Sequence, residues 1–317
     1  MAGEGIYSSS ARRRTWAPLT IPLVWLFVYA GVWVSGQIAQ PLGFMVTMGN
    51  GRWTDNIAAL FASLPVVGCL WLWLRFYERG SLVGLGLYGR GGRLFARGAG
   101  IGVLLVFAVA AAGVLAGAYQ IDGLGAWTGH FTSTWVLATI LSFVGTTIQA
   151  TATEAMYRGW MLDTVAARWG QRIAIVFNVA AALVIQAGMN ALSSPEAFIS
   201  GINLGLMSAI LSLVSVRSGS LWTAAGLHTG WNLAMGWALG LNIDGGHLSV
   251  TPGVLALSTN GDAPAWLSGG GIGPDGSVLF TLGAVVLLIT QVWPRGEGAG
   301  LAKVRHYGHD DDEIIDH

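Results

Sequence analysis

Long apolar stretches separated by short polar or charged segments dominate this chain of 317 residues. A membrane-spanning helix needs about 20 predominantly apolar residues, and eight stretches approach or exceed that length. They cover residues 18–40, 57–74, 98–119, 135–161, 173–192, 198–216, 221–241 and 278–292. The pattern therefore predicts an all-α fold, a polytopic transmembrane helical bundle of about eight spans.

The remaining segments lie at the two ends and in one long loop. We expect residues 1–16 to form a cytosolic N-terminal segment, residues 17–295 a single integral membrane domain, and residues 296–317 a charged cytosolic tail. The loop over residues 242–277 is rich in Gly, Ser, Pro and Asp and is too long for a simple connector. It should pack over the outer mouth of the bundle or be partly disordered.

Composition supports a membrane protein and excludes several other classes. Apolar residues make up 53% of the chain and charged residues only 10%, whereas soluble proteins have about 25%. The formal net charge of zero leaves no basic face for a nucleic acid. The single cysteine, Cys69, cannot form an internal disulfide or a multi-thiolate metal site, and no His-Glu-x-x-His motif occurs. We therefore expect the lipid bilayer as a partner, no nucleic acid, no cofactor and no metal.

The distribution of basic residues predicts the orientation of the bundle. If the N-terminus is cytosolic, all 16 arginines and lysines except Arg52 lie in cytosolic segments, as the positive-inside rule requires. Both termini should then be cytosolic. The first apolar stretch lacks an Ala-x-Ala cleavage site, so we interpret it as a transmembrane helix and not as a signal peptide.

Pairs of glycines four residues apart predict close contacts between helices. Small residues at this spacing let the backbones of two membrane helices approach each other. Such pairs are Gly98/Gly102, Gly113/Gly117, Gly201/Gly205, Gly226/Gly230 and Gly236/Gly240. We expect some of them to lie at helix–helix interfaces.

A few polar residues interrupt the apolar spans. Glu154 and Arg158 lie one turn apart in the fourth span, and His228 and Asn232 repeat that spacing in the seventh. Gln186 lies in the fifth span. Because polar groups need partners in hydrocarbon, we expect all five side chains to face one cavity near the cytosolic side or mid-membrane, with Glu154 paired to Arg158. Thr153 should line the same cavity.

Simpler structural roles are open for the same residues. Glu154 and Arg158 can be an ion pair that closes one end of a span and orients helices. His228 and Asn232 can be an interhelical hydrogen-bond pair, typically worth about 0.6 kcal/mol. Gln186 can be an ordinary satisfied polar contact.

The polar residues resemble the motifs of a known family. Residues 153–159, Thr-Glu-Ala-Met-Tyr-Arg-Gly, are similar to the Glu-Glu-x-x-x-Arg-Gly motif of the CPBP intramembrane proteases, also called the CAAX protease and bacteriocin-processing, or Abi, family. Residues 228–232 resemble that family's His-x-x-x-Asn motif. Segments 81–87 and 267–277 resemble further family segments, so the family-like part covers about residues 81–293. The resemblance implies a bacterial plasma membrane location.

The resemblance also implies a chemistry. In the family the first Glu activates a water, motif histidines bind that water or the developing oxyanion, and peptides are cut within the membrane. Glu154, Arg158, His228 and Asn232 match the family's site positions. Thr153 stands at the first Glu position, and Gln186 stands at the second-motif His position unless a small gap places Asn190 there.

These departures predict impaired catalysis. Neither a Thr hydroxyl nor a Gln amide can act as a general base. Glu154 can ionise, but one step along a helix turns a side chain by about 100°, so we expect it to point away from the family's water. The neighbouring Arg158 should also lower its basicity.

Three functions remain open. The first is a catalytically impaired member that binds membrane peptides or proteins as a scaffold or regulator. The alternative is an active intramembrane endopeptidase that cleaves membrane-associated proteins or peptides with Glu154 as its base. A small-molecule transporter ranks last, because the sequence has no internal repeat.

Overall fold

The structure, a computed structural model, describes residues 6–7, 13–46, 53–87, 91–129, 131–187, 193–247 and 250–292, with only the backbone given for 186 and 187. Most of the described chain is helical, which confirms the predicted all-α membrane bundle. Most of the predicted N-terminal segment and the whole of the 296–317 tail lie outside the described residues.

Each predicted span corresponds to helical structure. Among the described residues, five helical stretches are long and apolar enough to cross a membrane: Ala17–Leu42, Trp53–Glu78, Gly91–Leu115, Ser133–Trp169 and Pro195–Ser218. Two shorter apolar helices cover Gln171–Ile185 and Val278–Val292. The stretch predicted at 221–241 forms a helix that ends at Ala238. The chain is thus an integral membrane protein, and the count of eight spans stays a prediction.

The helices are numbered along the chain. Before the motif region lie α1 (Thr20–Ala39), α2 (Trp53–Phe61), α3 (Ser63–Leu72) and α4 (Gly91–Leu115). They are followed by α5 (Ser133–Glu154), α6 (Leu162–Trp169), α7 (Gln171–Ala182), α8 (Pro195–Ser218), α9 (Trp222–Asn232), α10 (Ala265–Ser268) and α11 (Val278–Val292). Single π-helical segments extend α3, α5, α7 and α9; they cover Trp73–Glu78, Ala155–Met161, Leu183–Ala187 and Leu233–Ala238.

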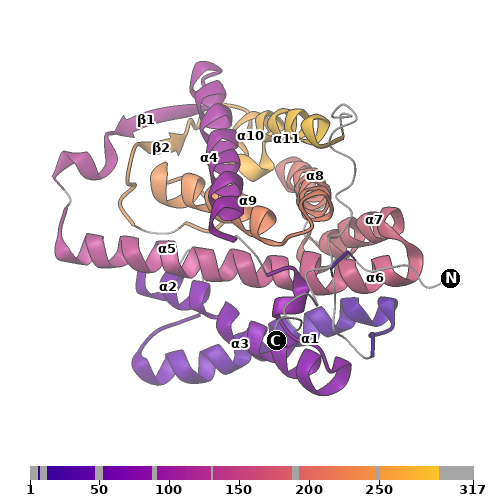
Figure 1. The fold of residues 1–317 in the computed structure, drawn as a ribbon. Coiled ribbons are helices and arrows are strands. Elements are labelled where there is room, and N and C mark those ends of the chain that lie inside the picture. The colour runs from indigo at the N-terminus through magenta and orange to yellow at the C-terminus, as the bar shows by residue number, and fades with distance from the viewer. Residues whose placement is uncertain are drawn as a thin grey trace, which may run out of the picture.

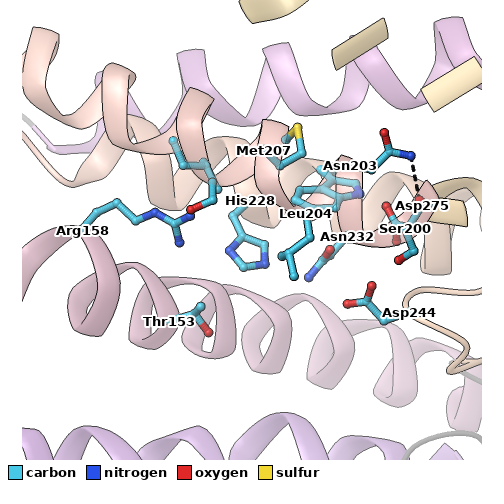
Figure 2. A pocket seen from close by; sticks show the side chains of 13 residues that line it. Thr153, Arg158, Ser200, Asn203, Leu204, Met207, His228, Asn232, Asp244 and Asp275 are labelled. Carbon is cyan, nitrogen blue, oxygen red and sulfur yellow. Dashed lines mark hydrogen bonds between the residues drawn. The ribbon is translucent and has the colours of Figure 1, made fainter. Parts of the chain in front are cut away.

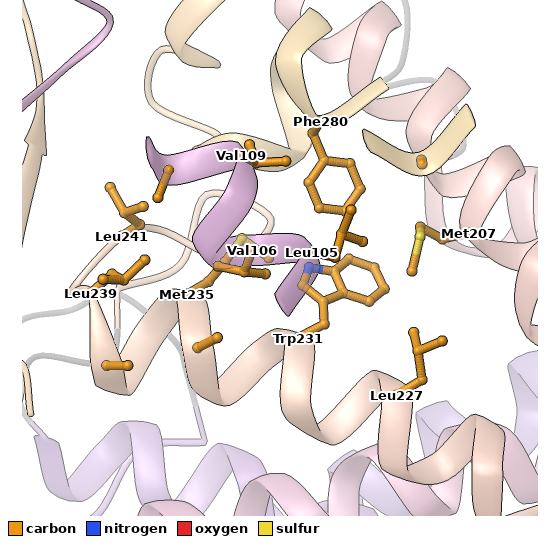
Figure 3. Close-up of a cluster of buried hydrophobic side chains, with 14 of the residues drawn as sticks. Leu105, Val106, Val109, Met207, Leu227, Trp231, Met235, Leu239, Leu241 and Phe280 are labelled. Carbon is orange, nitrogen blue, oxygen red and sulfur yellow. The ribbon is translucent and has the colours of Figure 1, made fainter. Parts of the chain in front are cut away.

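Helix α5 crosses the middle of the bundle (Figure 1). Helices α2 and α3 pack on one side of it, and α9 packs on the other. The largest buried apolar cluster lies beyond α9, where Trp231 of α9 contacts Phe280 of α11 at 5.6 Å between ring centroids (Figure 3). Large apolar side chains such as Tyr29, Ile140 and Val286 point outward and are exposed, which suits helices surrounded by lipid.

Two of the predicted glycine pairs form the most extensive helix–helix contact, between α4 and α9. A Cβ atom added at Gly98 would lie 2.1 Å from the carbonyl oxygen of Thr223, and one at Gly226 would lie 2.1 Å from the carbonyl oxygen of Phe95. The second glycine of each pair makes an equally close approach. Only glycine lets these two backbones lie so close, so the contact holds α9 in place beside α4.

The described part of the 242–277 loop packs against the bundle, while its predicted place at the outer mouth stays a prediction. Its strand β2 (Ala256–Thr259) pairs antiparallel with β1 (Tyr119–Gly123), with Tyr119 opposite Thr259. The Tyr119 hydroxyl donates to the carbonyl oxygen of Ser268 at 2.9 Å. This small sheet was not predicted, because strands of four and five residues leave too short an alternating pattern to recognise in the sequence.

Candidate active site

A buried carboxylate with two basic partners forms the centre of the candidate site. Glu154 Oε1 lies 3.3 Å from Arg158 Nη1 and 2.8 Å from His228 Nδ1. The Glu154 side chain is fully buried, and that of Arg158 is 3% exposed. The predicted Glu154–Arg158 pair is therefore confirmed, and His228 joins it from another helix. We call Glu154, Arg158, His228 and Asn232 the His228 centre.

The backbone near the two motifs departs from regular α-helix. Glu154 is the last residue of α5, and Arg158 lies in the π-helical segment that follows. His228 and Asn232 lie on the last turns of α9, directly before a second π-helical segment. Single π-helical turns occur often at functional sites, because the extra residue changes the direction of the side chains around it.

Two spaces that share lining residues adjoin this centre. The larger is a cavity of about 470 Å³ between α5, α1 and α2. The smaller, which we call the inner chamber, has a volume of about 40 Å³ and extends toward α8 and the 242–277 loop (Figure 2). Both spaces are lined by Thr153, His228, Asn232 and Asp244. The inner chamber exceeds the roughly 10 to 15 Å³ that one water requires.

Both spaces have mixed walls with more apolar than polar surface. Apolar side chains form most of the wall of the larger cavity, among them Trp25, Val28, Leu60, Met156 and Ile185. The inner chamber is lined by apolar side chains of α8 and α9 and by polar ones, among them Ser200, Asn203, Asn232, Asp244 and Asp275. An extended apolar chain can lie in the larger cavity, where His228, Asn232 and Asp244 offer hydrogen-bond partners to its backbone.

Thr153 lines the cavity as predicted, and Glu154 does not line it. The Thr153 hydroxyl donates to the carbonyl oxygen of Gln149 at 3.0 Å. Glu154 lies outside the cavity, as the turn of the helix between residues 153 and 154 predicts, and it contacts His228. The expectation that Glu154 faces the cavity together with the other polar side chains was wrong. Helix α9 packs directly against α5, so the direction that leads away from the cavity leads to the back of His228.

The last of the six predicted site positions stays untested. Gln186 lies on the π-helical extension of α7, but its side chain is not among those the structure describes. Asn190, which a gapped alignment would place at the same motif position, lies outside the described residues. Neither side chain can be placed relative to His228.

Two carboxylates that sequence reasoning did not select also line the inner chamber. Asp244 and Asp275 come from opposite ends of the 242–277 loop. Asn203 of α8 holds one end in place, because its side-chain amide donates to the carbonyl oxygens of Asp275 and Ser277 at 2.8 and 3.0 Å. In the sequence, Asp244 and Asp275 are marked only by their positions near the two ends of a long loop between spans.

The two loop carboxylates have different surroundings. Asp275 is 3% exposed, and burial followed by the nearby charge of Asp244 raises its pKa well above the ordinary value. The indole N–H of Trp231 faces Asp275, but neither carboxylate oxygen completes a hydrogen bond. Burial also raises the pKa of Asp244, while the charge of His228 lowers it. Protein surrounds Asp244, yet its side chain is exposed to the space that it lines.

Metal ligands do not gather at this site. In the part of the chain that the structure describes, no three His, Cys, Asp or Glu side chains lie close enough together to hold a metal ion. The chemistry available from the described residues is that of a buried carboxylate, a histidine, an arginine, an amide and the two loop carboxylates.

Residues 131–234 match the family model of Rce1-like proteins, described as type II CAAX prenyl endopeptidases. The match confirms the resemblance to the CPBP, or CAAX protease, family. It includes the whole His228 centre and ends before Asp244 and Asp275. No curated protein and no solved structure gives a significant match to the chain.

Proposed function

We propose that this membrane protein, which resembles CAAX proteases, binds an apolar peptide segment of a membrane protein or membrane peptide in the cavity beside His228. The observation that carries the proposal is the cavity of about 470 Å³, whose wall is mostly apolar and whose inner end has side chains that can hydrogen-bond a peptide backbone. Ligand pockets generally combine these two features at volumes of about 300 to 1,000 Å³.

The matched family suggests the chemical class of the ligand. A prenyl endopeptidase, by its name, acts on peptides that carry a prenyl chain, which is an apolar group. In this chain, Trp25, Val28 and Leu60 offer an apolar surface to such a group, and Asn232 and Thr153 offer polar partners to the adjoining peptide bond. A farnesylated C-terminal peptide is therefore the first probe, with the same peptide without farnesyl for comparison.

Catalysis through the family's first-motif position should be impaired. Thr153 has no carboxylate there, and its hydroxyl already donates to its own helix. In the competing hypothesis Glu154 is the base. A general base must contact the attacking water. Glu154 is fully buried, and its carboxylate contacts Arg158 and His228 instead. Glu154 is better suited to orient the His228 ring by holding Nδ1, which leaves the other ring nitrogen for the cavity.

A matched pair of substitutions tests the binding proposal. Ile185 lines the cavity, whereas its neighbour Val184 is 58% exposed on the outside of the bundle. In lipid nanodiscs, Ile185→Trp should raise the Kd of the farnesylated peptide about tenfold or more, because the indole fills the cavity, and Val184→Trp should leave it unchanged. Equal effects of the two variants, or no binding by the natural protein, would refute the proposed function.

A gain-of-function variant tests the impairment. Thr153→Glu combined with Gln186→His should raise peptide hydrolysis by roughly 10² or more, because it returns both family groups to the water site. His228→Ala in that background should lower the rate again. If Glu154 is the base instead, Glu154→Gln abolishes cleavage by the natural protein and the double substitution brings no gain.

A further inference from the structure

The inner chamber contains a carboxylate that can replace the one missing at Thr153. Asp244 lines both the cavity and the inner chamber together with His228 and Asn232. In Figure 2 the side chains of His228, Asn232 and Asp244 project toward the same space, with Thr153 on the opposite wall. Asp244 comes from the 242–277 loop and lies outside the part of the chain that matches the family model.

The backbone holds Asp244 in a defined position. Residues 243–246 form a tight turn in which Ile243 and Gly246 exchange backbone hydrogen bonds of 2.8 and 2.7 Å. Asp244 and Gly245 occupy its corners with φ of 48° and 81°, the positive values that a type I′ turn requires and that Asp-Gly favours. The Gly245 amide also donates to the carbonyl oxygen of Ile272 at 3.0 Å, which ties the turn to the other end of the loop.

Asp244 is the loop carboxylate suited to accept a proton from water. Asp275 is 3% exposed and lies beside Asp244, so its neutral form is favoured. Asp244 is exposed to the chamber; burial raises its pKa, and the charge of His228 opposes that rise. No direct hydrogen bond joins Asp244 to His228, and the chamber that both residues line has room for a water molecule.

We infer that Asp244 is the general base of this site, and that the bound peptide is hydrolysed by a water held between Asp244 and His228. The inference rests on the proposed peptide binding and adds a reaction to it. Asp244 takes one proton from the water, and the resulting hydroxide forms a bond to the peptide carbonyl carbon. The Asn232 amide and His228 stabilise the oxyanion.

The reaction returns the site to its starting state. When the tetrahedral intermediate collapses, the carbon–nitrogen bond breaks, and the leaving amine takes the proton from Asp244. The products are a new carboxyl terminus and a new amino terminus, and the Asp244 carboxylate is regenerated. The proposed reaction needs neither an oxidant nor a metal ion.

The variant Asp244→Asn tests the inference, with Asp262→Asn in the same loop as its matched control. Asparagine adopts positive φ readily, so the turn should keep its shape. In nanodiscs, Asp244→Asn should lower the kcat for the farnesylated peptide about 10² to 10⁴-fold, with the Kd within about twofold of the natural value. Asp262→Asn should change neither quantity. Adding Thr153→Glu to Asp244→Asn should raise the kcat at least about tenfold above that of Asp244→Asn alone, because position 153 lines the same chamber.

The possible failures separate the two proposals. If the natural protein binds the peptide but does not cut it, the proposed function stands and the inference is wrong. The inference is also wrong if Asp244→Asn cuts at the natural rate, or if it loses binding in proportion to its lost rate. That last result would make Asp244 a binding group for a cationic part of the peptide. If no peptide binds, the proposed function itself fails.

Discussion

Glu154 at the end of α5 makes two contacts, and only one of them is local. The contact with Arg158 follows from the spacing along one helix, whereas the contact with His228 joins residues 74 positions apart. Glu154 Oε2 and Arg158 Nε lack hydrogen-bond partners among the described residues. The cluster is therefore held by two hydrogen bonds to one carboxylate oxygen, in a buried environment where leaving a charge unpaired is costly.

Removing the Glu154 charge should destabilise the protein more than an exposed ion pair would. Glu154→Gln leaves the buried Arg158 guanidinium without its counter-charge, which we expect to cost about 3 kcal/mol or more. Thermal unfolding in detergent micelles measures the loss. Adding Arg158→Met should recover much of it, because the double variant buries no unpaired charge. A single variant as stable as the natural protein would contradict the assigned ion pair.

The buried carboxyl of Asp275 should make stability depend on pH. Its pKa is raised in the folded protein, first by burial and then by Asp244, so the folded state holds the proton more tightly than the unfolded chain does. This contribution favours folding below the ordinary pKa of an aspartate and is lost as the pH rises through the raised value.

Asp275→Asn removes this dependence, because the amide has no charge to bury. We expect the variant to be more stable than the natural protein by about 1 to 3 kcal/mol at about pH 8, with a smaller difference at about pH 5. Melting curves at the two pH values measure both differences, with Asp262→Asn as the exposed control. A variant that is less stable at about pH 8 would mean that the Asp275 charge has a favourable partner in the folded protein.

At the scale of elements, the position of His228 depends on how closely α9 approaches α4. Gly226 and Gly230 of α9 lie against the backbone carbonyls of Phe95 and Ala99, and α4 presents Gly98 to α9 in return. The opposite side of α9 carries His228 and Asn232 toward α5 and the cavity. Any change that separates α9 from α4 should therefore also move His228 relative to Glu154.

Adding a methyl group at this interface tests the dependence. Gly226→Ala places a carbon about 2 Å from a carbonyl oxygen, so the helices must separate, and overpacking typically costs about 1 to 3 kcal/mol. Gly100→Ala is the matched control, because a Cβ there meets no atom within 4 Å. We expect a lower melting temperature and weaker peptide binding for Gly226→Ala, and neither effect for Gly100→Ala. Equal behaviour of the two variants would show that the close approach is not required.

For the whole molecule, the orientation in the membrane decides toward which side of the membrane Asp244 lies. Charge bias predicts that both termini lie in the cytosol and the 242–277 loop outside, which would give an even number of spans. The inner chamber adjoins that loop, so in this orientation one end of it lies toward the outer side, whereas the sequence predicted a cavity near the cytosolic side or mid-membrane.

Topology can be measured with the cysteine-free variant Cys69→Ala, since Cys69 is the only cysteine. New cysteines at Gly3, Gly261 and Gly308 should separate into two groups with a reagent that does not cross membranes. Gly261 should react from outside intact cells, and the other two should react only after the membrane is opened. Reaction of just one terminus from outside would make the number of spans odd and would contradict the prediction.

The properties that depend on neighbours along the chain could be predicted from the sequence. Apolar length and sparse charge predicted helical spans, because hydrocarbon requires every backbone hydrogen bond to be satisfied within a helix. Motif spacing predicted the Glu154–Arg158 pair, since residues four apart share a helix face. The same motifs carry the family resemblance, and glycine spacing predicted close helix–helix contacts, although not that α4 and α9 are the helices that meet.

The tertiary structure alone decided what depends on contacts between distant segments. It placed Glu154 behind His228 and outside the cavity, because α9 packs against the face of α5 that carries Glu154. It also brought Asp244 and Asp275 into the chamber through a loop whose strand β2 pairs with β1 from the connection between α4 and α5. No local pattern specifies this pairing, because its hydrogen bonds join residues more than a hundred positions apart.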